Sequence, residues 1–279
     1  MAAAKPIPDI RRLAINTATT KKQWGLREAA EHYARAGIAG IDPWRDQVAA
    51  VGLADAARII KDNGLTVTGL CRGGFFPYAD AAHKQRNIDD NLKAIDEAAA
   101  LGAHCLVLVC GGLPQASKNI AEARQMVTES IAHILPHARK CGVPLAIEPL
   151  HPMYAADRSV VTSLAEANDI CDQLGEGVGI AYDVYHLWWD HAIERETRRA
   201  KGRILAFHVC DWLVTTRDLL LDRGMMGDGV IDIPYLRRLV EETGYNGFIE
   251  VEIFSERDWW QRAPEEVIAV CQQRYREFV

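Results

Sequence analysis

Residues 144–150 read PLAIEPL, an apolar run that carries one carboxylate, Glu148, near its end. The run is short, aliphatic and bounded by prolines, which is typical of a buried strand in a parallel sheet. A carboxylate at the end of such a strand costs free energy unless a partner compensates its charge. Glu148 therefore predicts a partner, and the neighbouring strands indicate what that partner is.

Two further predicted strands end in the same way. Alternate residues of a strand point to the same face, so in each strand an alanine shares its face with the polar group that follows two positions later. These polar groups are Glu148 after Ala146, Asp183 after Ala181 and His208 after Ala206. The last predicted strand places Glu250 and Glu252 on one face, with Glu252 nearer the carboxyl end.

The chain as a whole alternates short strands with longer amphipathic segments. We predict strands over residues 12–18, 39–44, 65–71, 104–110, 144–150, 178–184, 204–210 and 247–254. We predict helices over 26–36, 47–63, 87–103, 119–142, 163–174, 190–200, 232–243 and 264–277. Eight such units in 279 residues predict an α/β protein, a (β/α)8 TIM barrel that forms a single domain over 1–279.

The alternative architecture is an open, doubly wound sheet. That fold is expected to carry a glycine-rich phosphate loop after an early strand, and CRGGFFP at 71–77 lacks the required spacing. Glycines mark the predicted helix ends at positions 37, 64, 102, 142 and 244. Pro136 predicts a kink or the last turn of the helix that contains it.

Composition excludes several classes of protein. The chain is 49% hydrophobic and 25% charged, with a formal net charge of −6, which favours a large core and gives no sign of nucleic-acid binding. We expect no membrane partner, because no run of 18 apolar residues occurs and the first residues lack the apolar core of a signal peptide. Seven scattered cysteines without a CxxC pair predict buried thiols, and we expect a cytoplasmic protein.

The polar strand ends predict a metal site. Active sites of such barrels lie at the carboxyl ends of the strands, where Glu148, Asp183, His208 and Glu252 should meet. A single strand-end carboxylate is usually a helix cap or an ion-pair partner, and a single buried histidine is usually a core residue. Three carboxylates and one imidazole in a small space instead favour one divalent cation, Mn²⁺ above Mg²⁺, Co²⁺ or Zn²⁺.

Five motifs give a family resemblance. They are IEPL (147–150), YDVYH (182–186), FHVCD (207–211), GDGVID (227–232) and GFIEVEIF (247–254). Together they resemble the xylose isomerase-like TIM barrel superfamily, which includes sugar phosphate isomerases and epimerases, ketose 3-epimerases, inosose dehydratase and endonuclease IV. The resemblance implies that Glu148, Asp183, His208 and Glu252 are metal ligands. By strand alternation Glu250 should lie one layer below Glu252.

Two branches of this superfamily fit the sequence poorly. Endonuclease IV-like enzymes carry three zinc ions with extra histidines on strands three and four, and here those strands end in GLCRGG and LVCGG. Xylose isomerase proper uses two metals and a lysine, and no lysine stands at a strand end. We therefore expect one metal ion, proton transfer and a small sugar or sugar derivative as substrate, with no role for DNA.

The resemblance also implies catalytic roles. Glu148 and Glu252 would remove and return a proton beside a sugar carbonyl, and His186 and His151 would act on substrate oxygens. Arg217, Trp212, Asp211 and His186 are predicted to bind substrate. The main expectation is a sugar isomerase or epimerase. A lyase remains an alternative, as a dehydratase or by β-elimination from a keto-glycoside, because His151 offers a second acid. A non-catalytic sugar-binding subunit is the third.

The sequence contains further residues that fit more than one role. Trp188, Trp189, Trp212, Trp259 and Trp260 follow barrel strands, where they would stack on a sugar ring or form a subunit interface in a homo-oligomer. The segment 215–229 predicts a long loop over the site, in which Arg217 and Asp218 either reach substrate or pair with each other. Arg203, Arg217 and Arg223 lie near one another in sequence as candidates for a phosphate site.

Overall fold

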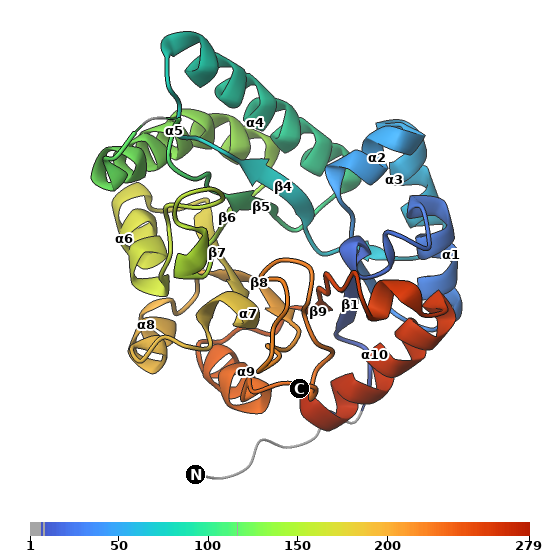
Figure 1. Ribbon diagram of the computed structural model, residues 1–279. Helices are drawn as coiled ribbons and strands as arrows, with labels where there is room; N and C mark the ends of the chain where they lie inside the picture. The colour runs from blue at the N-terminus through green and yellow to red at the C-terminus, as the bar shows by residue number, and fades with distance from the viewer. Residues whose placement is uncertain (1–6, 8, 116) are drawn as a thin grey trace.

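The computed structural model describes residues 7, 9–115 and 117–279, and it shows a ring of parallel strands surrounded by helices (Figure 1). The strands follow one another around the ring in the order β3-β2-β1-β9-β8-β7-β6-β5-β4. Their bounds are β1 (Leu13–Asn16), β2 (Gly40–Asp42), β3 (Thr66–Val67), β4 (Leu70–Gly74), β5 (Leu106–Val109), β6 (Leu145–Glu148), β7 (Val178–Asp183), β8 (Ile204–Val209) and β9 (Ile249–Val251).

The predicted third strand is divided into two pieces. β3 pairs with β2, and β4 pairs with β5, so the ring passes from one piece to the other through Thr68 and Gly69. The backbone N–H of Cys71 donates to the carbonyl of Pro43 at 3.1 Å, which connects β4 to the chain that follows β2. With β3 and β4 taken as two pieces of one strand, the eight predicted strands of the barrel are present. The prediction of a (β/α)8 barrel is therefore confirmed.

The helices form the outer layer of the barrel. They are α1 (Leu26–Arg35), α2 (Arg45–Val51), α3 (Leu53–Asp62), α4 (Ala81–Leu101), α5 (Ile120–Cys141), α6 (Leu164–Leu174), α7 (Val184–Leu187), α8 (Ile193–Arg199), α9 (Ile233–Glu242) and α10 (Pro264–Phe278). The predicted helix 47–63 is two helices, because Gly52 has a φ of 85° that interrupts it. α5 continues through Pro136, so the prediction that this proline marks the last turn is wrong.

Glycines end the helices at the positions predicted from the sequence. Gly37, Gly64, Gly102, Gly142 and Gly244 all have positive φ, a conformation in which a Cβ is strained. At Gly102 the backbone N–H donates to carbonyls of the preceding turn of α4, and Gly142 does the same for α5. These caps turn the chain from each helix into the strand that follows it.

The inside of the barrel is filled by small residues beneath the strand ends. Ala146, Ala181 and Ala206 lie in one buried cluster with three other residues, Cys71, Cys105 and Val107. Larger aliphatic and aromatic side chains fill the layer between the strands and the helices. Because the alanines are short, the polar groups that follow them on β6, β7 and β8 have room to turn inward at the carboxyl end of the barrel.

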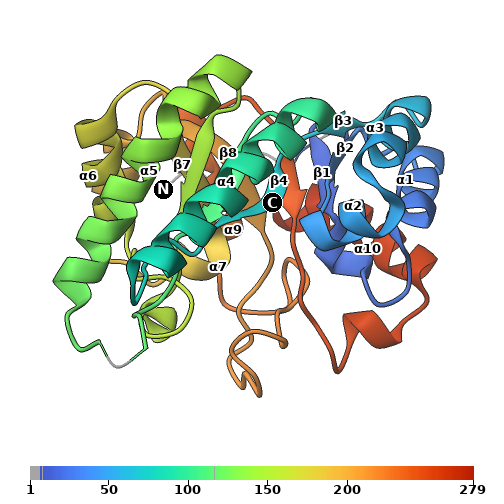
Figure 2. The ribbon, with the colours of Figure 1, turned by 90° about the horizontal axis from the view of Figure 1, so that it is seen from above.

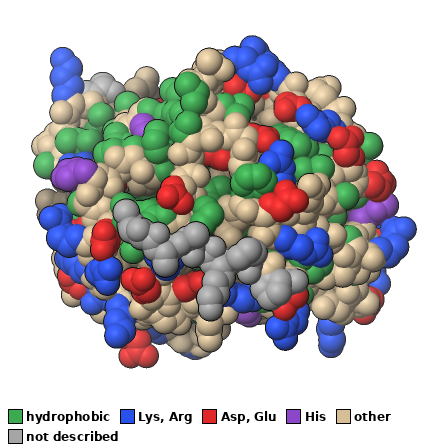
Figure 3. All heavy atoms as spheres, turned by 90° about the horizontal axis from the view of Figure 1, so that it is seen from below, with side chains coloured by type: hydrophobic (Ala, Val, Ile, Leu, Met, Phe, Trp, Pro, Cys, Tyr) green, Lys and Arg blue, Asp and Glu red, His purple; other side chains and the backbone are tan. Residues whose placement is uncertain are grey.

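Two features of the exterior complete the description. The segment between β8 and α9, orange in Figure 2, extends beyond the strand ends. Acidic and basic side chains are interspersed over the face shown in Figure 3, without a field of one sign. None of the helices in the described part of the chain is long and apolar enough to cross a membrane.

Candidate metal centre

Four predicted ligands come together at the carboxyl end of the barrel. Glu148 ends β6, Asp183 ends β7, His208 is the penultimate residue of β8, and Glu252 directly follows β9. One ligand atom of each lies within 4.8 Å of the others, and all four side chains are buried. The parallel register pairs Asp183 with His208, so neighbouring strands deliver their polar groups at one height. These residues therefore form a compact set of three carboxylates and one imidazole.

His208 lacks a hydrogen-bond partner within this set. Its Nδ1 atom lies 3.4 Å from Oε1 of Glu148 and 4.0 Å from Oε2 of Glu252. Both ring nitrogens are buried, and neither forms a hydrogen bond among the described residues. A buried polar atom without a partner is rare in a folded protein. A cation bound by Nδ1 and the surrounding carboxylates would satisfy it, so the residues present fit a divalent metal ion.

The carboxylates at this site repel one another in the absence of a cation. Burial raises the pKa of Glu252 to about 8; Arg223 opposes this rise, and Glu148 adds to it. Burial also raises the pKa of Asp183, but Arg223 and the two nearby histidines more than offset this, and the net shift is downward. Asp183 is thus ready to bind a cation, whereas Glu252 must lose a proton first.

A second polar layer lies directly below the ligands. Glu250 accepts hydrogen bonds from Asn16 at 3.0 Å and from Thr68 at 2.7 Å, and its Oε1 lies 3.5 Å from Nε2 of His208. Asp42 completes this layer, and burial together with Glu250 raises its pKa well above the ordinary value. Asp42, Glu250 and His208 are close enough to hold an ion, but they share His208 with the upper set. The expected position of Glu250 beneath Glu252 agrees with this arrangement.

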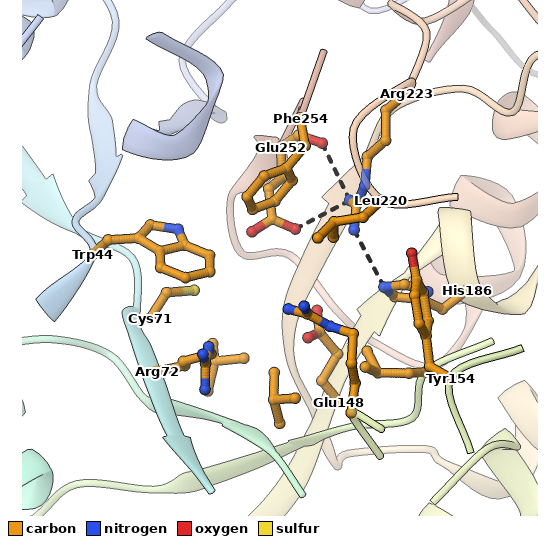
Figure 4. Close-up of a pocket in the computed structure, with 14 residues that line it drawn as sticks. Trp44, Cys71, Arg72, Glu148, Tyr154, His186, Leu220, Arg223, Glu252 and Phe254 are labelled. Carbon is orange, nitrogen blue, oxygen red and sulfur yellow. Dashed lines mark hydrogen bonds and ion pairs between the residues drawn. The ribbon is translucent and has the colours of Figure 1, made fainter. Parts of the chain in front are cut away.

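Arg223 is a cation that contacts two of the four candidate ligands, a role that the sequence did not predict. Its Nη1 donates to Asp183 at 3.1 Å and to Glu252 at 3.2 Å, and its Nη2 lies 3.2 Å from Nε2 of His186 (Figure 4). The guanidinium is buried against the rings of Tyr185 and Phe254. The sequence feature that could have indicated this role is the position of Arg223 at the end of the loop over the site, before the glycine-rich MMGDG segment.

His186 faces the same pocket as a neutral imidazole. Burial lowers the pKa of His186 to about 3, because the charged form is poorly solvated there. Its Nδ1 accepts the backbone N–H of His151 at 3.2 Å, and Nη2 of Arg223, which can only donate, lies 3.2 Å from its Nε2. The Arg223 guanidinium presents N–H donors to the pocket beside this imidazole. Converging donors of this kind suit a substrate oxygen.

The pocket above the ligands is narrow. Its volume is about 30 Å³, and its lining includes Glu148, His186, Arg223 and Glu252 together with Leu220 and Tyr154. That volume holds about one water molecule. A sugar needs more space than this pocket offers alone.

Two predicted substrate residues lie behind this pocket. His151 caps a short turn, where its Nδ1 accepts the N–H of Met153, and its ring stacks on Trp212 with centroids 5.2 Å apart. Trp212 also packs on Tyr185 and Trp188. Neither His151 nor Trp212 lines the cavity over the ligands. Of the two, His151 contacts a residue that does line it, because its backbone N–H donates to Nδ1 of His186.

Asp211 organises the glycine-rich segment. Its carboxylate accepts the backbone N–H groups of Trp212, Gly227, Gly229 and Ile231. These bonds fix the chain that follows Arg223. Asp211 thus contacts the loop backbone, and its predicted contact with substrate stays a prediction.

Arg217 pairs within its own loop. Its backbone N–H donates to Asp222 at 2.8 Å, and its guanidinium forms an ion pair with the same carboxylate. Arg203 pairs with Asp172, away from this loop. The three arginines that sequence proximity suggested for a phosphate site therefore do not converge, because each pairs with different carboxylates, Arg223 with Asp183 and Glu252.

A third group of possible ligands lies elsewhere. Asp96 on α4 lies beside His137 and Cys141 on α5, with Oδ1 of Asp96 2.7 Å from Nε2 of His137. This group is partly exposed on the outer helices. It belongs to a different part of the fold from the pocket at the strand ends.

With this geometry established, comparison with known proteins identifies the family. Residues 29–272 match the family described as xylose isomerase-like TIM barrel. The chain belongs to this family. The resemblance predicted from the five motifs is thereby confirmed, and the chain is placed in a superfamily of sugar isomerase- and epimerase-like barrels.

The proteins similar to this chain include the following three. Inosose isomerase of Bacillus velezensis is 24% identical over 277 residues, which cover 94% of this chain and 95% of the relative. The crystal structure of protein SMc04130 from Sinorhizobium meliloti 1021 is 59% identical, with a TM-score of 0.95 over 97% of this chain and 99% of the other. A crystal structure of the IolI protein with a bound zinc atom has a TM-score of 0.83 at 20% identity, over 96% and 98% of the two chains.

Proposed function

We propose that this chain is a divalent-metal-dependent sugar isomerase or epimerase that moves a proton on the carbon beside a carbonyl. The observation that carries the proposal is the convergence of Glu148, Asp183, His208 and Glu252 around the unpartnered nitrogen of His208. The inosose isomerase relative supports the reaction class, and the zinc-bound structure supports the use of a divalent metal.

The proposed roles follow from the positions of the residues. Glu148, Asp183, His208 and Glu252 would hold the cation. When bound, a divalent cation polarises a sugar carbonyl and stabilises the negative charge of an enediolate. Glu148 and Glu252 both line the pocket, so one carboxylate takes the proton from the reacting carbon and the other returns it. His186 and Arg223 donate hydrogen bonds to the substrate oxygens as charge develops on them.

The geometry favours isomerisation or epimerisation over elimination. An elimination needs an acid that protonates a leaving oxygen, and His151 was the candidate for that role. His151 does not line the pocket, and its Nδ1 is engaged by a backbone N–H. Two carboxylates on one pocket are sufficient for a proton transfer that leaves the substrate carbon skeleton intact.

Solvent exchange tests this proposal. Metal-loaded protein would be incubated in D₂O with ketoses and aldoses of five and six carbons and with inososes, and deuterium at the carbon beside the carbonyl would be followed by NMR. We expect exchange that requires the metal and is lost in Glu148→Gln. Absence of exchange with every sugar, in protein shown to contain metal, would contradict the proposal.

A further inference from the structure

Three cations near the pocket have no acidic partner. Within the described ranges, no carboxylate forms an ion pair with Lys21, Arg72 or Arg158, and their charged groups form no hydrogen bond. Arg45, by contrast, pairs with Asp90 and Glu97 nearby. Cations beside a pocket that lack a counter-charge are poised to receive an anion.

Arg72 is the most informative of the three. Its guanidinium lies 4.1 Å from the ring centroid of Phe75 and 5.7 Å from that of Trp44, and its Nε is buried without a hydrogen-bond partner. Aromatic rings hold the flat face of a guanidinium and leave its N–H edges free. Burial lowers the pKa of Arg72 and of Lys21, as expected for cations without a close counter-charge. Packing on the two rings therefore leaves Nε of Arg72 without a hydrogen-bond acceptor.

The position of Arg72 connects two cavities. It lines the narrow pocket beside Glu148 and Glu252, as Figure 4 shows, and it also lines an adjoining cavity of about 320 Å³. Lys21 and the backbone of Gly73 and Gly74 line that larger cavity. A substrate with its reacting carbons at the metal ligands would extend past Arg72 into this space.

The charge of the larger cavity is positive. Arg45 and Asp90, both on its wall, neutralise each other through hydrogen bonds of 2.9 and 3.0 Å. Asp46 is the remaining acid of the lining, against the two cations Lys21 and Arg72. Arg158 adds a third positive charge from the narrow pocket, close enough to Arg72 to lower its pKa further.

We infer that the substrate carries an anionic group, a phosphate ester or a carboxylate, at the end remote from the reacting carbons, and that Arg72, Lys21 and Arg158 receive it. This inference rests on the proposed function, because it takes the reacting end of the sugar to lie at Glu148 and Glu252. The larger cavity then selects for sugar phosphates or sugar acids over neutral sugars.

The experiment compares neutral and anionic probes. Deuterium exchange is measured with D-ribulose, D-ribulose 5-phosphate and D-fructuronate on metal-loaded wild type, Arg72→Met, Arg72→Lys and Lys21→Met, with Lys22→Met as the matched control. We expect wild type to prefer one anionic probe, and the preferred probe tells phosphate from carboxylate. Arg72→Met should lower kcat/KM for that probe by about 10- to 100-fold, mainly through KM. The same substitution should change kcat/KM for the neutral probe by less than threefold.

The variants separate an anion site from a packing role. Arg72→Lys should recover part of the loss, and Lys22→Met should behave as wild type because Lys22 lines neither cavity. Equal losses on neutral and anionic probes in Arg72→Met would overturn the inference, as would a wild type that prefers D-ribulose. Either result leaves the proposed reaction standing.

A binding measurement covers the case in which no exchange occurs. D-ribose 5-phosphate and D-ribose are titrated calorimetrically into metal-loaded wild type and Arg72→Met. Tighter binding of the phosphate that disappears in the variant supports the anion site even if the proposed reaction fails. Equal affinity for the two sugars in wild type contradicts the anion site.

Discussion

Nε2 of His208 lies 3.5 Å from Oε1 of Glu250, whereas Nδ1 of the same ring lies 3.4 Å from Oε1 of Glu148. The two nitrogens thus face different layers of carboxylates. A histidine that binds a metal through one nitrogen usually has its other N–H oriented by a neighbouring acceptor. Glu250 is placed to be that acceptor, and Asn16 and Thr68 hold it in turn.

Replacing Glu250 should weaken metal binding without removing a ligand. For Glu250→Gln we expect a loss of about 10- to 100-fold in metal affinity, because the imidazole loses the carboxylate that orients it. Calorimetric titration with Mn²⁺ checks this, with circular dichroism to confirm the fold. Glu242→Gln, at the exposed end of α9, is the control. Unchanged affinity in Glu250→Gln would show that this carboxylate has only a packing role.

Metal binding should release protons and weaken as the pH falls. The pKa of Glu252 is raised to about 8 in the metal-free protein, so below that pH its carboxyl group is protonated and must ionise to bind a cation. The carboxylates around His208 also raise its pKa, although burial opposes them. Titrations at pH 6 to 9 in buffers of different ionisation enthalpy would measure the proton release. An affinity that does not change across this range would disagree with the prediction.

Arg223 and Arg217 lie on one loop, and substitution of Arg217 serves as the control for substitution of Arg223. Arg223→Met should lower kcat by about 100-fold or more, because it removes donors that face the developing charge. Arg217→Met should stay within about threefold of wild type, since Arg217 pairs with Asp222 outside the pocket. Steady-state exchange rates check both variants. A larger loss of kcat in Arg217→Met than in Arg223→Met would contradict the role given to Arg223.

The two histidines can be separated in the same way. His186→Asn should reduce kcat strongly, because its Nε2 faces the pocket, whereas His151→Asn should reduce it much less. The backbone of His151 contacts His186, and that contact survives the substitution. Measured pH–rate profiles should keep their shape in His151→Asn. A profile that loses one limb in that variant would point to His151 as an acid in the reaction.

Asp211→Ala should loosen the glycine-rich segment. Four backbone N–H groups lose their acceptor, and each one left unpaired costs about 1–3 kcal/mol where water cannot reach it. We expect a lower Tm and faster amide hydrogen exchange in residues 224–231. Protection equal to wild type in this segment would contradict the role given to Asp211.

The architecture and the convergence of the four candidate ligands could be predicted because both follow from the strand pattern. Alternation placed Glu148, Asp183 and His208 two residues after small inward alanines, and the barrel fold brought them to one end. Strand ends were less accurate: β9 stops at Val251, one residue before Glu252. Gly69 lies in the break of the third strand, where the carboxylate of Asp42 leaves no room for a Cβ.

The loop residues could not be predicted from local sequence. Arg217 and Arg223 occupy the same loop with the same charge, and only the tertiary structure shows that Asp222 engages one while the other reaches Asp183 and Glu252. His151 was assigned to the pocket because it is close to Glu148 in sequence. The turn that follows Glu148 instead directs its ring toward Trp212. The predicted homo-oligomer and cytoplasmic location remain predictions.

Anomalous diffraction from crystals soaked in Mn²⁺ tests the central claim most directly. The account predicts one strong manganese peak per chain, in contact with side-chain atoms of Glu148, Asp183, His208 and Glu252. A peak only at Asp96, His137 and Cys141, or no peak at the strand ends in fully soaked crystals, would contradict it.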